Sequence, residues 1–135
     1  MARYLTAQEI LVLHALVIDE TGGSHGVRDI GLLASVAMRP QLIIGGVEMF
    51  PDLFLKAARY FESLAHYHLF VDGNKRTALT ATARFLAQNG YELTATNAQA
   101  EAFTLKVVLE KPGIETIAAW LRRHCAKDAR RRRDR

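Results

Sequence analysis

The residue types that could do chemistry gather in one stretch near the middle of the chain, His68-Leu69-Phe70-Val71-Asp72-Gly73-Asn74-Lys75-Arg76-Thr77. An imidazole and a carboxylate precede a Gly-Asn pair, two cations and a hydroxyl follow it, and a helix-forming run begins at Ala78. A loop that leads into a helix points several backbone N–H groups at one position, where the helix dipole favours anions. Because Lys75 and Arg76 add positive charge there, we predict a phosphate-binding loop with His68 beside it.

Four residues of this loop are predicted to hold the phosphates. Gly73 lets the backbone approach the phosphates closely, and the N–H groups from Gly73 to Arg76 can form an anion-binding nest. Arg76 can grip phosphate oxygens at two points, whereas Lys75 adds a point charge. Asn74 can orient either the loop or a phosphate, and the sequence leaves these two roles open.

The acid and the histidine of the loop are assigned to a metal ion and to proton transfer. Asp72 is the carboxylate of the loop, and Mg²⁺ takes one or two carboxylates together with phosphate oxygens. A histidine with a reference pKa of about 6.5 can take the proton from a substrate hydroxyl at neutral pH. We therefore predict Asp72 as the Mg²⁺ contact and His68 as the catalytic base.

Several other signatures of nucleotide and metal sites are absent from the sequence. There is no GxxxxGK[ST] loop, no HRD and DFG pair of a protein kinase, and no HExxH zinc motif. His66 and His68 lie two positions apart with no third ligand nearby, which makes a weak metal site. The central loop therefore remains the candidate site.

The stretch HLFVDGNKRTAL, residues 68–79, resembles the active-site motif of the Fic/Doc family in its Doc (death-on-curing) form. In Fic proteins that transfer AMP, the motif is approximately H-x-F-x-[DE]-G-N-G-R-x-x-R. This chain has Lys75 where those enzymes have Gly, and Leu79 where they have a second Arg. Both departures are the ones that Doc-type toxins show, and GVRDIGLLASVAMRPQ, residues 26–41, also resembles the corresponding Doc segment. The positions that match the Fic motif are His68, Phe70, Asp72, Gly73, Asn74 and Arg76.

The resemblance implies a toxin of a toxin–antitoxin system that acts as an ATP-dependent protein kinase. Doc toxins place the γ-phosphoryl group of ATP on a Thr of the translation elongation GTPase, which arrests translation. Lys75 crowds the phosphate nest and Leu79 removes one holder of the terminal phosphates, so both favour phosphoryl transfer over AMP transfer. A Fic-type AMP-transferase and an inactive Fic-like binding module remain the alternatives.

The resemblance also bears on regulation. Many Fic proteins inhibit themselves with an [ST]-x-x-x-E-[GN] helix, but none of the eight Glu residues here has Ser or Thr four positions before it. We therefore expect restraint from an antitoxin protein in trans.

The spacing of apolar and capping residues predicts one all-α bundle of about six helices with a small β-hairpin flap near residues 41–50. The flap turns at Gly45-Gly46, and we expect it to pack on the helices and to hold a protein substrate beside the active site. Tyr91-Glu92-Leu93 is expected as an extended connector. The predicted helices are residues 7–20, Ile30–Met38, a third from Pro51 to His68, a fourth from Asn74 or Lys75 to residues 89–90, a fifth from Thr96 or Asn97 to Leu109, and a sixth over residues 114–124.

The net charge of +4 lies at the C-terminal end of the sequence. Residues 130–135 contain five arginines and one aspartate, so the other 129 residues carry no net charge. We predict a Fic/Doc-like domain over residues 1–126 and a basic, disordered tail over residues 127–135. Nucleic acid is the less favoured partner of that tail.

Cysteine use and apolar runs predict a cytoplasmic protein with no membrane partner. Cys125 is the single cysteine, so no internal disulfide can form. The first nine residues lack the apolar segment of a secretion signal. The longest apolar runs are nine residues each, and a helix needs about 20 to cross a bilayer.

Overall fold

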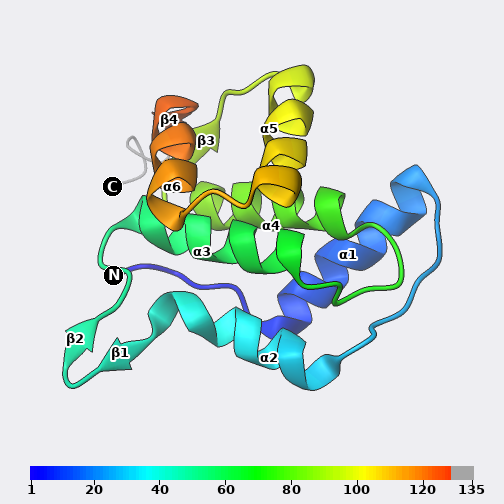
Figure 1. Ribbon diagram of the computed structural model, residues 1–135, viewed down its shortest axis with the longest axis horizontal. Helices are drawn as coiled ribbons and strands as arrows, with labels where there is room; N and C mark the ends of the chain where they lie inside the picture. Colours follow the sequence, from blue (N-terminus) through cyan, green and yellow to red (C-terminus); the bar gives the residue numbers. More distant parts are fainter. Residues whose placement is uncertain (129–135) are drawn as a thin grey trace.

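The computed structural model describes residues 1–128 of the 135-residue chain, and the arginine-rich part of the predicted tail lies outside the described residues. The predicted all-α bundle with a small hairpin is confirmed (Figure 1). The helices are α1 Ala7–Thr21, α2 Ile30–Met38, α3 Leu53–His66, α4 Asn74–Gln88, α5 Asn97–Glu110 and α6 Ile114–Arg123, with a 3₁₀ turn at Arg39–Gln41. The strands are β1 Ile43–Ile44, β2 Val47–Glu48, β3 Tyr91–Leu93 and β4 Cys125–Lys127.

Side-chain caps fix the start of most of these helices. Thr6 and Thr96 form capping boxes at α1 and α5, and Asp29 caps α2 by accepting from the N–H of Leu32. The prediction that Pro51 stands in the first turn of α3 is wrong. Asp52 accepts hydrogen bonds from the N–H groups of two following residues, so the helix begins at Leu53 and Pro51 precedes the cap.

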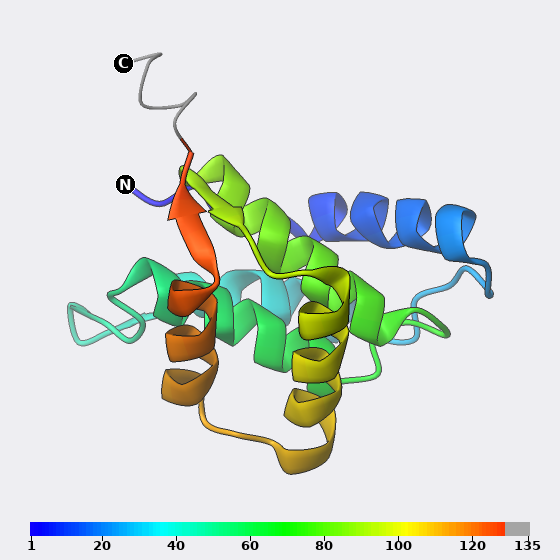
Figure 2. The ribbon, with the colours of Figure 1, turned by 90° about the horizontal axis from the view of Figure 1, so that it is seen from above.

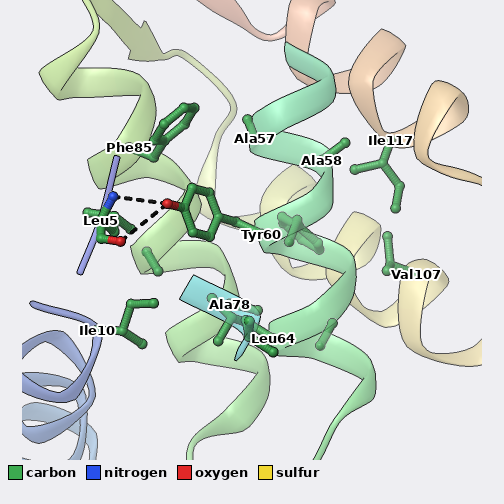
Figure 3. Close-up of a cluster of buried hydrophobic side chains, with 14 of the residues drawn as sticks. Leu5, Ile10, Ala57, Ala58, Tyr60, Leu64, Ala78, Phe85, Val107 and Ile117 are labelled. Carbon is green, nitrogen blue, oxygen red and sulfur yellow. Dashed lines mark hydrogen bonds between the residues drawn. The ribbon is translucent and has the colours of Figure 1, made fainter. Parts of the chain in front are cut away.

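The core forms around the pair α3 and α4, which pack against each other along their length (Figures 1 and 2). Helix α4 also contacts α1 and α5. Fully buried Tyr60 from α3 reaches across this core, and its hydroxyl accepts from the N–H of Leu5 at 2.9 Å (Figure 3). Burial raises the pKa of the Tyr60 hydroxyl, so it stays a neutral hydrogen-bonding group. No helix within residues 1–128 is long and apolar enough to cross a membrane.

A second small sheet joins segments that are far apart in the sequence. Strand β3, predicted as a connector, pairs antiparallel with β4, with Tyr91 opposite Lys127 and Leu93 opposite Cys125. Figure 2 shows this pair beside the C-terminal end of α6. Within residues 1–128, strand β4 therefore includes Lys127, which the sequence prediction assigned to the tail.

The hairpin forms where the sequence predicts it, but not where a substrate flap is needed. Gly45 and Gly46 adopt φ of +57° and +79° between β1 and β2, as a tight turn requires. Both ribbon views place the hairpin at the opposite end of α3 from the loop that joins α3 to α4. Since α3 has 14 residues, its length of about 20 Å separates the two. The expectation of a flap beside the central loop is therefore wrong in this structure.

The hairpin also does not bury its apolar side chains. Ile43, Ile44 and Val47 are 57–64% exposed, which contradicts the expectation that they pack on the helices. Lys56 of α3 ties the hairpin to the bundle, because its ammonium donates to Oε1 of Glu48 at 3.0 Å and to the carbonyl of Phe50. The Lys56 side chain is 5% exposed and its ammonium is paired with Glu48. This contact fixes the base of the hairpin and leaves the strands in solvent.

Replacing Tyr60 by Phe tests the buried hydrogen bond across the core. The Tyr60→Phe change leaves the Leu5 N–H without this acceptor, so we expect the free energy of unfolding to fall by about 1–3 kcal/mol. Urea denaturation followed by circular dichroism measures it. Tyr67→Phe is the control, because it removes a hydroxyl from an exposed side chain; equal losses in the two variants would contradict the role given to Tyr60.

Candidate active site

The central stretch of chemistry-bearing residues forms the loop between α3 and α4. Helix α3 ends at His66, so His68 lies two residues beyond it and not in its last turn as the sequence predicted. The His68 side chain is exposed, and it is therefore accessible to a substrate hydroxyl.

Two adjacent buried residues hold the loop in place. Leu69 and Phe70 are buried at 0% and 1% exposure, while His68, Val71 and Asp72 are exposed. Phe70 thus anchors the loop in the core. The buried pair ties the loop to the core while its polar neighbours face solvent.

The segment between α1 and α2 pairs with the loop as a short strand would. The N–H of Arg28 donates to the carbonyl of Leu69 at 2.7 Å, and the N–H of Val71 donates to the carbonyl of Gly26 at 3.1 Å. Val27 and Phe70 form an isolated antiparallel bridge between these two bonds. This pairing is not predictable from the sequence, because a single bridge leaves no alternating pattern long enough to recognise.

The structure supports one of the two roles that the sequence left open for Asn74. Its amide oxygen accepts from the N–H of Phe70 at 3.0 Å, and its amide nitrogen donates to the carbonyl of the same residue at 2.9 Å. Both ends of the amide are therefore used to close the loop. Asn74 orients the loop rather than pointing its side chain at a ligand.

Gly73 begins α4 with a backbone conformation that other residues rarely adopt. It has φ of +75° and ψ of 20°, and a Cβ there would lie 2.9 Å from Cδ1 of Ile18 in α1. Lacking a side chain, Gly73 gives α4 no side-chain cap, unlike the Thr and Asp caps of α1, α2, α3 and α5. The N–H groups of the first turn can therefore serve an anion.

Lys75 and Arg76 stand in this first turn and line an open hollow against α5. The hollow has a volume of about 310 Å³, and its other walls are Leu79, Glu101, Thr104 and Leu105. Such a volume falls at the lower end of ligand pockets. The structure thus brings the two predicted cations together at one hollow, whereas His68 and Asp72 stand on the loop outside its lining.

Asp72 is held at both its backbone and its carboxylate. Nε2 of His14 in α1 lies 2.8 Å from the carbonyl oxygen of Asp72 and donates to it, because a carbonyl can only accept. The backbone N–H of Ser24 donates to Oδ2 of Asp72, also at 2.8 Å. The His14 side chain is buried, at 3% exposure. Nothing in the sequence spacing indicates either contact, since both span more than 45 positions.

The segment that supplies Ser24 also matches a hydrolase pattern. Gly22-Gly23-Ser24-His25-Gly26 reads G-x-S-x-G, in which the serine is a nucleophile on a strand-to-helix turn. Here the segment joins two helices, and the Ser24 backbone supports Asp72. Nε2 of His25 pairs with Oδ1 of Asp19 at 2.9 Å on an exposed surface. The strand that this pattern requires is absent from the segment, so it does not mark a nucleophile.

Comparison with known proteins places this loop in a family. A sequence profile of the Fic/DOC family matches residues 4–86. The chain belongs to the Fic/DOC family. It is 43% identical over 95 residues to "Toxin Doc" of Mycolicibacterium smegmatis, covering 70% of this chain and 71% of that protein. It is 35% identical over 91 residues to "Protein kinase doc" of Escherichia phage P1, covering 67% and 71%. The resemblance to the Doc type within the Fic/DOC family is therefore confirmed.

Replacing Gly73 by Ala tests the close approach of α1 to the start of α4. An alanine at this position is strained by the positive φ, and its Cβ would be too close to Ile18. We therefore expect the free energy of unfolding to fall by about 1–3 kcal/mol. Gly46→Ala is the matched control, because Gly46 has a similar φ of +79° but nothing within 4 Å of its Cβ position. Thermal and urea unfolding compare the two; a smaller loss at Gly73 than at Gly46 would refute the contact.

Proposed function

We propose that this Fic/DOC protein is a Doc-type toxin that transfers the γ-phosphoryl group of ATP to a Ser or Thr hydroxyl of a protein. The observation that carries the proposal is the start of α4, where a helix without a side-chain cap presents Lys75 and Arg76 beside the Doc-type loop. Phosphoryl transfer requires chiefly positioning and charge neutralisation. A helix start with free N–H groups and two cations could neutralise the phosphates, and the exposed His68 on the same loop could act as the base.

The reaction assigns one role to each part of the loop. The hydroxyl oxygen of the substrate attacks the γ-phosphorus, the bond from that phosphorus to the β–γ bridging oxygen breaks, and ADP leaves. An unprotonated ring nitrogen of His68 takes the hydroxyl proton. The N–H groups from Gly73 to Arg76 and the Lys75 and Arg76 side chains hold the phosphates. Asn74 contributes by keeping the loop closed.

Asp72 suits a single Mg²⁺ contact. Its carboxylate is exposed and is oriented through Oδ2 by the Ser24 N–H. Within residues 1–128 no group of three or more His, Cys, Asp or Glu could hold a metal ion alone, so phosphate oxygens and water would complete the shell. That ligand set is the one Mg²⁺ prefers. A bound Mg²⁺ would neutralise charge on the phosphates during transfer.

Two residues favour phosphoryl transfer over AMP transfer. Lys75 adds a charge and a side chain where the AMP-transferring motif has Gly, and Leu79 lines the hollow where that motif has a second Arg. The hollow therefore lacks one cation that would hold the terminal phosphates in the AMP-transfer pose. The name of the phage P1 relative, a protein kinase, supports the same choice. An AMP-transferase is the second candidate, and an inactive binding module the third.

Labelled ATP separates these three activities. We incubate the protein with a bacterial lysate and ATP labelled at either the α or the γ phosphate, and expect label on protein from the γ position. His68→Ala should reduce transfer by at least about 100-fold, because the base is lost. His25→Ala, a change at another exposed histidine, should leave transfer intact.

Label arriving from the α position alone would replace the kinase by an AMP-transferase. No label from either position, with folded protein, would leave the binding module. A purified translation elongation GTPase, added in place of the lysate, tests the expected target directly by mass spectrometry of its Thr residues.

We further propose that an antitoxin protein restrains this toxin in trans. The sequence has no inhibitory [ST]-x-x-x-E-[GN] motif, and one relative is named a Doc toxin. Induced expression in bacteria should arrest growth, and His68→Ala should be tolerated because it removes catalysis and not folding. Co-expression of a small protein encoded next to the gene should restore growth. Equal arrest by both versions at equal protein levels would rule out catalytic toxicity.

A further inference from the structure

Asp72 depends on a buried histidine that the proposed reaction does not use. His14 comes from the middle of α1, 58 positions before Asp72 in the chain. Besides its hydrogen bond to the Asp72 carbonyl, its ring lies flat against the Phe70 ring, with centroids 3.8 Å apart and an interplanar angle of 8°. One side chain therefore contacts both the anchor of the loop and its carboxylate-bearing residue.

The contact is close to the point where α4 begins. The Cβ position of Gly73 is 3.8 Å from Nε2 of His14 and 3.6 Å from Cγ1 of Val17. Helix α1 thus forms the wall behind the whole turn from Phe70 to Gly73. His14 is the polar member of that wall, and its Nε2–H donates to the carbonyl of Asp72, the residue directly before Gly73.

The carboxylate of Asp72 is fixed separately, by the residues that follow α1. The Ser24 N–H holds Oδ2, which leaves the other carboxylate oxygen available to a ligand. A cation site binds its cation more tightly when the ligating side chain is already held in place before the cation binds. Holding the backbone of Asp72 through His14 and its carboxylate through Ser24 achieves this.

We propose that His14 is a positioning residue for the catalytic loop: its Nε2–H and its stacked ring hold Phe70 and Asp72 so that the Asp72 carboxylate and the start of α4 keep their relative geometry. The proposal deepens the proposed kinase function and rests on it for its catalytic consequence. The loop geometry itself does not depend on which reaction the site performs.

A second histidine provides an internal reference. His124 stacks on Trp120, with centroids 4.0 Å apart and an interplanar angle of 21°, and its Nδ1 donates to the carbonyl of Trp120 at 2.8 Å. It therefore makes the same two kinds of contact as His14, but at the end of α6. His124→Phe reports what losing such a contact costs when no catalytic loop depends on it.

Two substitutions separate the contacts of His14. His14→Phe keeps a flat ring against Phe70 and removes the donor to Asp72, whereas His14→Gln keeps a donor and removes the ring. We measure hydrogen exchange of the backbone amides of residues 69–75, the urea midpoint, and the kcat and KM of γ-phosphoryl transfer. The exchange measurement requires no ATP and no metal ion.

For His14→Phe we expect the urea midpoint to shift from the wild-type value by no more than it does for His124→Phe. We expect the loop amides to exchange about 10-fold faster than in the wild type. We expect kcat to fall on the order of 10-fold to 100-fold, as for other residues that orient a ligating side chain, with little change in KM for the protein substrate. His14→Gln should recover part of both the protection and kcat.

Unchanged loop exchange and unchanged kcat in His14→Phe would overturn the proposal, and so would equal loss of kcat in His124→Phe. If His14→Phe is unfolded, hydrogen exchange of the loop amides in His14→Gln decides. Protection between that of the wild type and that of unprotected amides supports the role of the hydrogen-bond donor. Wild-type protection refutes the role of the stacked ring. If the wild-type protein transfers no phosphoryl group, the proposed function fails, but loop exchange still tests the role of His14.

Discussion

The packing of α1 against the loop between α3 and α4 is the constraint on which the site depends. Seven residues without regular structure cannot hold one conformation alone, because fixing each backbone costs about 1–2 kcal/mol. Burial of Leu69 and Phe70, the bridge to residues 26–28 and the amide of Asn74 together offset this cost. The amide of Asn74 acts within the loop, whereas the bridge to residues 26–28 and the stacking of Phe70 on His14 require α1 and its following segment to lie beside it.

The charges at the start of α4 oppose what stability alone would favour. Cations in the first turn of a helix face the positive end of its dipole, and caps or acids are the stabilising choice there. This helix begins with a glycine and continues with Lys75 and Arg76. A local arrangement that costs stability is expected at functional sites, where a ligand supplies the missing partner. A bound phosphate group would satisfy both the N–H groups and the two side chains.

The hairpin shows how a correct element can be misplaced by analogy. Its turn and strands follow from local chemistry, but its distance from the loop follows from the direction of α3. The exposed side chains of Ile43, Ile44 and Val47 give the far end of the molecule an apolar surface.

The sequence by itself determined which segments form helices, where the hairpin turns, and the membership of the central motif in the Fic/DOC family. These depend on local spacing, which a linear pattern records. Only the tertiary structure decided that Asn74 closes the loop, that β3 pairs with β4, and that His14 and Ser24 hold Asp72. Except for the Asn74 bonds, which span four positions, these contacts join segments that are far apart in the sequence. All of them use backbone carbonyl or N–H groups, which nearly every residue type carries, so residue type alone does not predict them.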